Sequence, residues 1–295
     1  MVEGFLSQFQ FSEAAVRMTV FLGIFGIMGV WELVAPRRDL VAGKAGRWFG
    51  NLSIILLNTV LVRLIFPVIP VAMAVLARAK GWGILNYFNF PSWLEVIVAV
   101  LLLDLTIYLQ HVMFHTLPLL WRLHLVHHAD LDIDVTTGLR FHPVEIVLSM
   151  VIKLAAVSVI GPQPLAVVFF EVLLNGMAMF NHGNVRMPGS FDRALRYLLV
   201  TPDMHRVHHS VNIRETNSNF GFNLSWWDVL FGTYRERPAA GHEGMVIGLA
   251  QYRSPDELTL PRLIILPVTA DPGGYAINRR GRDPEAVGSA RTIEK

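Results

Sequence analysis

Cysteine is absent from all 295 residues of the sequence. This absence excludes disulfides, thiolate-bound zinc and iron–sulfur clusters, so any metal ion must be held by nitrogen or oxygen atoms. Charged residues are also scarce, at 16% of the chain, and the formal net charge is only +2. Because the basic residues are dispersed rather than gathered on one helix, no nucleic-acid partner is expected.

Apolar residues, in contrast, are abundant. They make up 53% of the chain, and the mean hydropathy is +0.45. A helix needs about 20 apolar residues to cross the ~30 Å hydrocarbon layer, and runs of this kind occupy 18–35, 52–77, 93–117 and 144–180. The last run is divided by GPQP at 161–164, which predicts a helical hairpin. We therefore expect an all-α, polytopic integral membrane protein.

Local signals mark the ends of one of these spans and a bend in another. Ser92 and Glu95 stand at capping-box spacing at the start of the third span, and Pro118 follows its end. The second span contains Pro67 and Pro70, which predict a bend there.

The distribution of basic residues predicts an orientation, because cytoplasmic loops are enriched in lysine and arginine. The connection 36–50 contains Arg37, Arg38, Lys44 and Arg47. Segment 78–91 contains two basic residues, and the hairpin tip contains none. We therefore expect 36–50 and every histidine motif on the cytoplasmic face, in a cell inner membrane or the endoplasmic reticulum. Residues 1–268 are predicted to form a single membrane-embedded domain, followed by a loose tail over 269–295.

Ten of the eleven histidines lie between residues 111 and 209. They form the motifs HVMFH at 111–115, HLVHH at 124–128 and HRVHH at 205–209. Residues three and four apart share a face of a helix, so each motif can present its rings together. Eight histidines exceed the three or four protein ligands of a mononuclear zinc site. The motifs therefore predict a site for two metal ions beside the membrane.

Neighbouring polar residues are candidates for holding the histidine rings in place, as carboxylates and carbonyl groups do at metal sites. These candidates are Asp130, Asp132, Asp134, Glu145, Asn181, Asn184 and Asp228. Asp104 and Tyr108 share a helix face with His111, and their role is left open between function and structural hydrogen bonding. His242 stands apart in a polar segment and is expected at the ordinary surface.

Three histidine motifs in this order around a hydrophobic hairpin resemble those of the fatty acid hydroxylase and sterol desaturase superfamily of membrane di-iron enzymes. The resemblance extends to TTGLRFHPVEI at 136–146, NHGN at 181–184 and NSNFGFNLSWWDVLFGTYR at 217–235. It covers roughly residues 92–265.

The resemblance implies a di-iron centre that activates O₂ and attacks a C–H bond of a membrane lipid. Carried over by motif, the ligands are His111, His115, His124, His127, His128, His182, His205, His208 and His209. His142 is implied as a ligand or as a support for one. Zinc is expected to replace iron in some overexpressed samples. A fused haem domain is missing, which implies a separate electron donor of the ferredoxin or cytochrome type.

Other functions remain as alternatives. A membrane zinc transporter or metal-handling protein would carry histidines or carboxylates along several spans, whereas these gather at one edge. A membrane b-type cytochrome would need single histidines facing each other from separate spans, and a zinc hydrolase would carry HExxH, which this chain lacks. The motifs leave open which lipid is used, and whether the product is an alcohol, an alkene or a cleaved ether.

Overall fold

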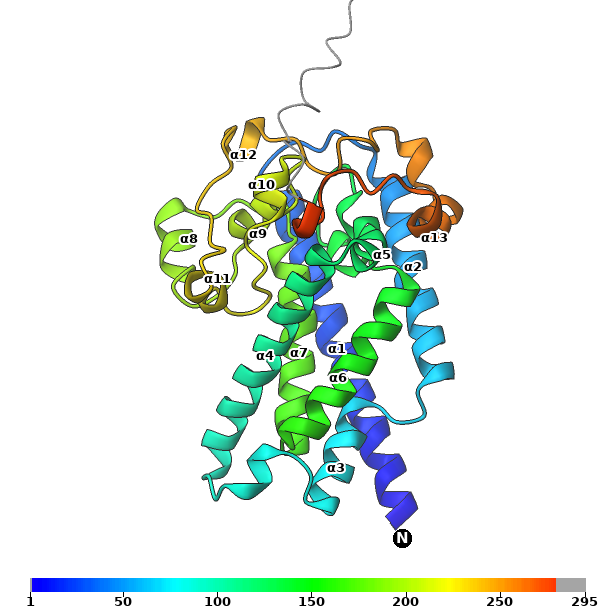
Figure 1. Ribbon diagram of the computed structural model, residues 1–295, viewed down its shortest axis with the longest axis vertical. Coiled ribbons are helices and arrows are strands. Elements are labelled where there is room, and N and C mark those ends of the chain that lie inside the picture. Colours follow the sequence, from blue (N-terminus) through cyan, green and yellow to red (C-terminus); the bar gives the residue numbers. More distant parts are fainter. Residues whose placement is uncertain (1, 280–295) are drawn as a thin grey trace, which may run out of the picture.

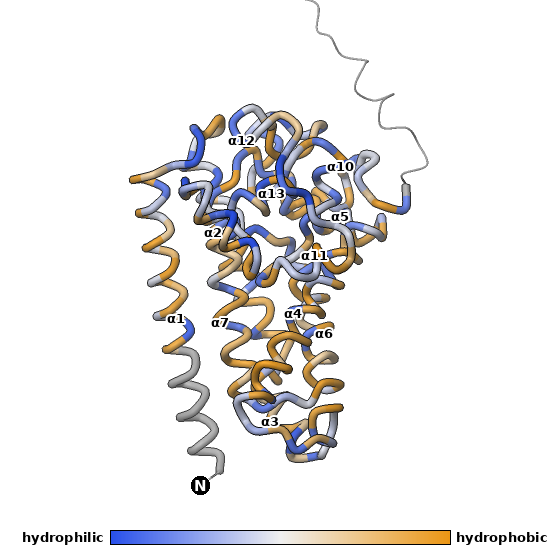
Figure 2. Tube along the Cα trace, turned by 90° about the vertical axis from the view of Figure 1, so that its left-hand side faces the viewer, coloured by the Kyte–Doolittle hydropathy of each residue, from blue (hydrophilic) through white to orange (hydrophobic). Residues whose placement is uncertain are grey.

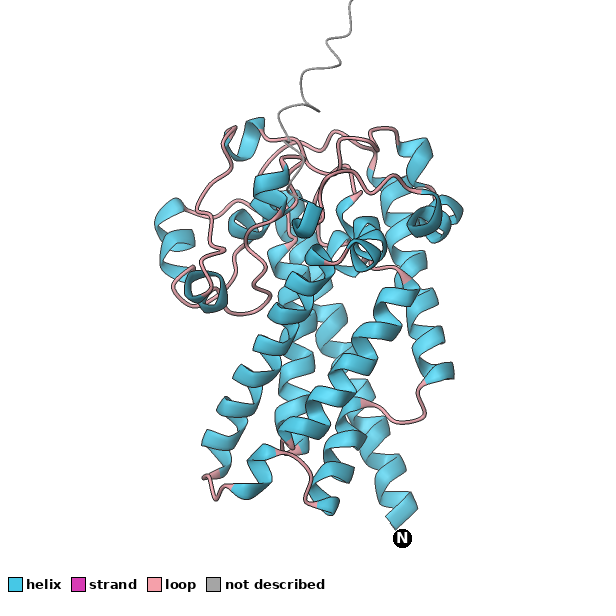
Figure 3. Cartoon of the chain, viewed as in Figure 1, coloured by secondary structure: helices cyan, strands magenta, loops and turns pink. Residues whose placement is uncertain are grey.

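The computed structural model describes residues 2–279 and contains helices and loops but no strand over that range (Figure 3). Long helices form a bundle, and short helices and loops form a cap at one end of it (Figure 1). Hydrophobic residues dominate the bundle and hydrophilic residues are concentrated in the cap (Figure 2). The predicted all-α, polytopic architecture is confirmed.

The helices of the bundle are α1 (Val2–Val34), α2 (Lys44–Ile65), α3 (Pro70–Lys80), α4 (Ser92–Thr116), α6 (Pro143–Ile160) and α7 (Pro164–Asn181). The helices of the cap are α5 (Pro118–His128), α8 (Gly189–Leu195), α9 (Pro202–His208), α10 (Ile213–Thr216), α11 (Trp226–Leu230), α12 (Gly241–Gly244) and α13 (Leu260–Thr269). Single 3₁₀ turns are η1 (Ile84–Tyr87), η2 (Thr137–Leu139), η3 (Pro255–Leu258) and η4 (Ile277–Arg279).

Five segments are long and apolar enough to cross a membrane. They are Ala15–Val34, Lys44–Tyr87, Ser92–Thr116, Pro143–Ile160 and Pro164–Asn181. The second of them is interrupted between α2 and α3, at the prolines that predicted a bend. The predicted hairpin of α6 and α7 is also confirmed, and Gly161 makes its turn with a left-handed φ of 67°.

The predicted capping box at the start of α4 is wrong. Pro91 is the N-cap, and no side chain caps the helix. The Glu95 carboxylate instead accepts hydrogen bonds from the Arg78 guanidinium and the Gln163 backbone N–H, at 2.8 and 3.1 Å. Glu95 therefore joins the end of α3 and the hairpin tip to α4, which holds the end of the bundle opposite the cap together.

The predicted connection 36–50 is shorter than expected, because α2 already begins at Lys44. Arg47 is therefore not a loop residue but a buried helical one. The connection lies on the cap side, and the 81–91 connection lies at the opposite end of the bundle (Figure 1). The two loops lie at opposite ends of the bundle, as the predicted topology requires.

The predicted loose tail is wrong for residues 270–279. Ala270, Tyr275 and Ala276 are buried in an apolar cluster around Trp121 of α5. The Trp121 indole donates a hydrogen bond to the Pro272 carbonyl at 3.0 Å, and its ring stacks on Tyr275 at a centroid distance of 5.7 Å. Residues 280–295 lie outside the described part of the chain. Proline, glycine and charge suggested a tail, but they did not reveal these aromatic contacts.

Candidate metal centre

Four segments bring the histidine motifs to one place at the junction of bundle and cap. His111 and His115 end α4, and after the break at Pro118 helix α5 presents the second motif. His182 follows the last residue of α7. Helix α9 presents the third motif, and its first turn is capped by the Thr201 hydroxyl, which accepts from the Met204 N–H.

The histidines form two groups. The first comprises His111, His115, His124, His128 and His208, and the second comprises His127, His182, His205 and His209. Within each group, one nitrogen from every ring lies within 4.8 Å of the others. All nine side chains are buried. These are the nine positions that the sequence singled out, and the two HxxHH motifs each contribute to both groups.

In the first group, backbone carbonyls determine which ring nitrogen carries the proton. Nδ1 of His111 lies 2.8 Å from the Phe220 carbonyl, and Nδ1 of His208 lies 2.8 Å from the Ser218 carbonyl. A carbonyl oxygen can only accept, so Nδ1 is the donor and Nε2 keeps its lone pair. Both Nε2 atoms are buried without a hydrogen-bond partner among the described residues. They are therefore oriented as metal ligands are.

Side chains hold two more rings of this group. Nδ1 of His124 is 2.6 Å from a carboxylate oxygen of Glu145, and Nδ1 of His115 is 3.3 Å from the side-chain oxygen of Asn217. Their Nε2 atoms are again buried and without a partner in the described chain. A carboxylate behind a ligating imidazole fixes its orientation and raises its basicity. Glu145 is thus placed as the sequence predicted.

In the second group, backbone carbonyls again hold two rings, and ring nitrogens of three histidines lie close to one another. Nδ1 of His182 lies 2.7 Å from the Ala178 carbonyl, and Nδ1 of His127 lies 3.2 Å from the Arg140 carbonyl. The Nε2 atom of His182 is 3.1 Å from Nε2 of His127 and 3.0 Å from Nε2 of His205. For His127 and His182, whose protons are on Nδ1, this places two lone pairs against each other. A cation between them would turn that repulsion into attraction, so the residues fit a metal ion.

Burial keeps these rings neutral. It lowers the pKa of His182 to about 4 and the pKa of His208 to about 3. Burial, and then repulsion from neighbouring imidazoles, also lowers the pKa values of His127, His205 and His209 well below the usual value. Neutral imidazole is the form that binds metal ions, so the rings are in the ligating form at pH 7.

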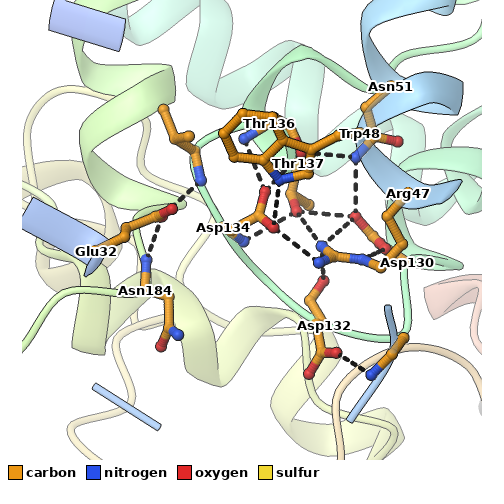
Figure 4. A network of polar contacts seen from close by, with 12 residues as sticks. Glu32, Arg47, Trp48, Asn51, Asp130, Asp132, Asp134, Thr136, Thr137 and Asn184 are labelled. Atoms are coloured by element: carbon orange, nitrogen blue, oxygen red, sulfur yellow. Dashed lines mark hydrogen bonds and ion pairs between the residues drawn. The ribbon is translucent and has the colours of Figure 1, made fainter. Parts of the chain in front are cut away.

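Asp130 and Asp134 contact Arg47 rather than the histidine rings (Figure 4). Arg47 binds Asp130 through two nitrogens, at 2.6 and 2.9 Å, and Asp134 at 2.7 Å. Asp132 accepts a hydrogen bond from the Ala42 N–H. The acidic segment after α5 thus neutralises a buried arginine of α2. An unpaired buried charge is costly, whereas backbone carbonyls already orient histidine rings, so these carboxylates serve the arginine and not the rings.

The remaining candidates are also placed away from the rings. Asn184 bonds to the backbone of Arg38, and Asn181 donates to the Phe222 carbonyl. The Asp228 carboxylate accepts from the N–H groups of Phe220 and Gly221, both at 2.7 Å. Asp228 therefore shapes the loop whose carbonyls hold the first group, without touching a ring.

His142 and His242 lie outside both groups. His142 caps α6 by accepting from the Val144 N–H, and its other nitrogen lies 3.0 Å from the Ile264 carbonyl. His242 was expected at the open surface, but its side chain is only 10% exposed and faces Asp203 at 3.7 Å. The expectation failed because Asp203 is distant in sequence.

The loop 217–220 supplies supports that the sequence analysis missed. The Asn217 side chain contacts His115. The backbone carbonyls of Ser218 and Phe220 contact His208 and His111, respectively. Every residue has a backbone carbonyl, so residue type gives no signal for such a contact. Gly138 is a further omission. A Cβ there would lie 2.3 Å from the Ala178 carbonyl oxygen that accepts from His182. The non-periodic run NSNFGFN was the available signal, since it predicts an irregular loop.

A small cavity opens beside the histidines between α4 and α6. Its non-histidine lining comprises Ile107, Gln110, Phe114, Phe141, Glu145 and Phe222, and His111, His124, His127 and His205 complete it. The walls are mainly apolar and aromatic, and ring atoms from both groups face the same space. An alkyl chain placed in this cavity would lie against the histidine cluster.

A family model described as fatty acid hydroxylase matches residues 96–233, which include both groups. This match and the curated relatives support the predicted resemblance to the fatty acid hydroxylase superfamily. The chain is 25% identical to the ornithine lipid hydroxylase OlsE of Rhizobium tropici, over 74% of this chain and 67% of that protein.

Further relatives align over shorter regions. Human alkylglycerol monooxygenase is 28% identical over 57% of this chain and 36% of its own length. Mouse cholesterol 25-hydroxylase is 26% identical over 49% of this chain and 48% of its own length. The chain thus spans less than half the length of these two relatives. No solved structure matches the chain.

Proposed function

We propose that the chain is an O₂-dependent oxidoreductase that uses two iron ions to hydroxylate or desaturate a C–H bond of a membrane lipid. The observation that carries this proposal is the pair of buried histidine groups, whose ring nitrogens converge within 4.8 Å in each group. The named relatives support a lipid substrate, because the three cited above are a lipid hydroxylase, an alkylglycerol monooxygenase and a cholesterol hydroxylase.

The proposed ligands are the five histidines of the first group and the four of the second. Bound iron would supply the one-electron and O₂ chemistry that amino-acid side chains lack. The protein's own part is to present unprotonated Nε2 atoms, which Glu145, Asn217 and the loop carbonyls hold in place. The adjoining cavity places the substrate chain, and burial of the rings excludes bulk water.

We propose that the cap faces the cytoplasm, so that lipid arrives through the bilayer and electrons arrive from a separate ferredoxin- or cytochrome-type donor. Arg37, Arg38 and Lys44, which are all partly exposed, belong to the connection after α1 and the first residue of α2, and this part of the chain lies on the cap side, as the positive-inside rule requires. One observation argues against metal transport. The carboxylate of Glu171, inside α7, pairs with Arg17 and Lys153, at 2.6 and 3.1 Å. It is therefore engaged in ion pairs rather than free to form part of a metal path.

The test is lipid mass spectrometry under ¹⁸O₂ of cells that express the wild-type chain, His208→Ala or His242→Ala, at matched folded yield. The wild type and His242→Ala should produce a lipid shifted by hydroxylation or desaturation, and His208→Ala should not. Purified wild-type protein should contain about two metal ions per chain. Equal lipid products in all three strains, or a folded wild type without bound metal, would contradict the proposal.

A further inference from the structure

The underside of the cap carries apolar side chains that no described residue covers. They belong to a lobe formed by residues 189–199 and 222–234, which includes α8 and α11. The exposed apolar residues of the lobe are Phe191, Tyr197, Leu198, Trp226, Val229, Leu230, Phe231 and Tyr234. Both views place α11 at the lower edge of the cap, beside the upper part of α4 (Figures 1 and 2).

Contacts with α4 determine the depth of the lobe. The Trp227 indole donates to the Asp104 carboxylate at 2.8 Å, the Tyr108 hydroxyl bonds to Thr233 at 2.9 Å, and the Tyr108 ring stacks on Phe231. These contacts settle the open question about Asp104 and Tyr108 in favour of structural bonding.

The positions of Asp104 and Tyr108 along α4 show how deep in the membrane these contacts lie. Ser92 lies at the far end of the bundle, where its carbonyl accepts from the Gln163 side chain at the hairpin tip. At 1.5 Å per residue, Asp104 and Tyr108 lie about 18 and 24 Å along α4 from that end. The hydrocarbon layer is ~30 Å thick, so both anchors lie within it, and the lobe that packs on them extends to the same level.

Irregular backbone is tolerated at such a depth only where its polar groups are bonded within the protein. Asp104 accepts from the N–H groups of Asn223 and Leu224, at 3.3 and 3.2 Å. Asp228 accepts from two further donors, on Phe220 and Gly221. Two buried carboxylates thus satisfy four backbone donors of a non-helical loop, as immersion in lipid requires.

We infer that the lobe is immersed in the cap-side leaflet of the bilayer, with lipid acyl chains covering Val229 and Leu230. The lobe's apolar surface continues the exposed apolar surface of α4, on which Leu109 is 51% exposed. Tryptophan and tyrosine are the side chains that favour this interfacial depth, and helices of this kind sink about 5–10 Å into the boundary. The inference does not depend on the proposed activity.

The experiment uses single cysteines, since the chain has none of its own. Val229→Cys, Leu230→Cys, Leu109→Cys and Val246→Cys are each labelled with a nitroxide and reconstituted in phosphatidylcholine–phosphatidylglycerol vesicles. Val246 is an exposed valine next to α12 on the far side of the cap, and Leu109 is the lipid-facing reference. Electron paramagnetic resonance then measures collisions of each label with O₂, which is enriched in lipid, and with a water-soluble nickel chelate.

The O₂-to-nickel collision ratio at residues 229 and 230 should approach the ratio at 109 and exceed the ratio at 246 several-fold. A ratio equal to that at 246 would overturn the inference, because the lobe would then lie in water. Low collision rates with both reagents would also overturn it, because a protein surface, such as a second copy of the chain, would then cover the lobe. Each variant replaces an exposed side chain, and its folding is checked by its elution profile.

Discussion

Replacing Arg47 by methionine should destabilise the protein strongly. The Arg47 side chain is 6% exposed and binds the carboxylates of Asp130 and Asp134, whose side chains are 1% and 0% exposed. Burial alone would raise the pKa of Asp130, but attraction to Arg47, and then to Arg140, holds that pKa below its usual range. Without Arg47, the nearest remaining cation to Asp130 is Arg140, at 3.8 Å.

The magnitude follows from the loss of one partner of a buried ion pair, which costs about 3–5 kcal/mol of unfolding free energy. Protonation of one carboxylate would limit the loss to the lower end of this range. At about 2–4 °C per kcal/mol, the melting temperature should fall by roughly 6–20 °C. Melting is followed by fluorescence-detected size-exclusion chromatography of heated, detergent-solubilised protein.

Arg63→Met is the matched control, because Arg63 lies on the same helix and is exposed. It should melt within a degree or two of the wild type. The triple variant Arg47→Met, Asp130→Asn, Asp134→Asn should recover part of the loss, since no unpaired buried charge remains. If the Arg47 and Arg63 variants melt together, the network in Figure 4 does not hold the cap on the bundle and the reasoning fails.

Three further outcomes are expected. Gly138→Ala should reduce bound metal, because its Cβ would collide with the carbonyl of α7 that holds a ring, whereas Gly46→Ala meets nothing within 4 Å and should not; equal metal contents would contradict this. Asn217→Ala should weaken metal binding about 10–100-fold in a chelator competition, and an unchanged affinity would remove its supporting role. Cysteines at Val41 and Ile84, both exposed, should react with an impermeant reagent from opposite sides of the membrane; labelling from one side would refute the topology.

Much of the fold follows from the sequence because apolar length and proline positions are strong local signals. The five spans, the break before Pro70 and the hairpin turn at Gly161 were all predictable in this way. The start of α2 was misplaced, because Arg47 looked like a charged loop residue. Its burial depends on carboxylates more than eighty residues away, which no local pattern reveals.

In the candidate site, too, features set by the local sequence were predictable, and features set by contacts between distant segments were not. The clustering of eight histidines in three motifs was predictable, because spacing alone puts His124 beside His128 and His205 beside His208. The ninth, His182, was implied only by the family resemblance. The atoms behind the rings were mostly not predictable, since many are backbone carbonyls such as that of Phe220. Glu145 was found because it is a carboxylate near a motif, and Asp130 was misassigned for the same reason.

The division of the histidines between the two groups has a consequence for biosynthesis. Four members of the first group, His111 to His128, precede the α6–α7 hairpin in the chain, and His208 alone follows it. In the second group only His127 precedes the hairpin. During translation the first group can therefore gather most of its histidines before the α6–α7 hairpin exists, whereas the second must wait for it. Metal loading should then be ordered, and a ribosome-bound chain truncated after α7 should bind one ion at most.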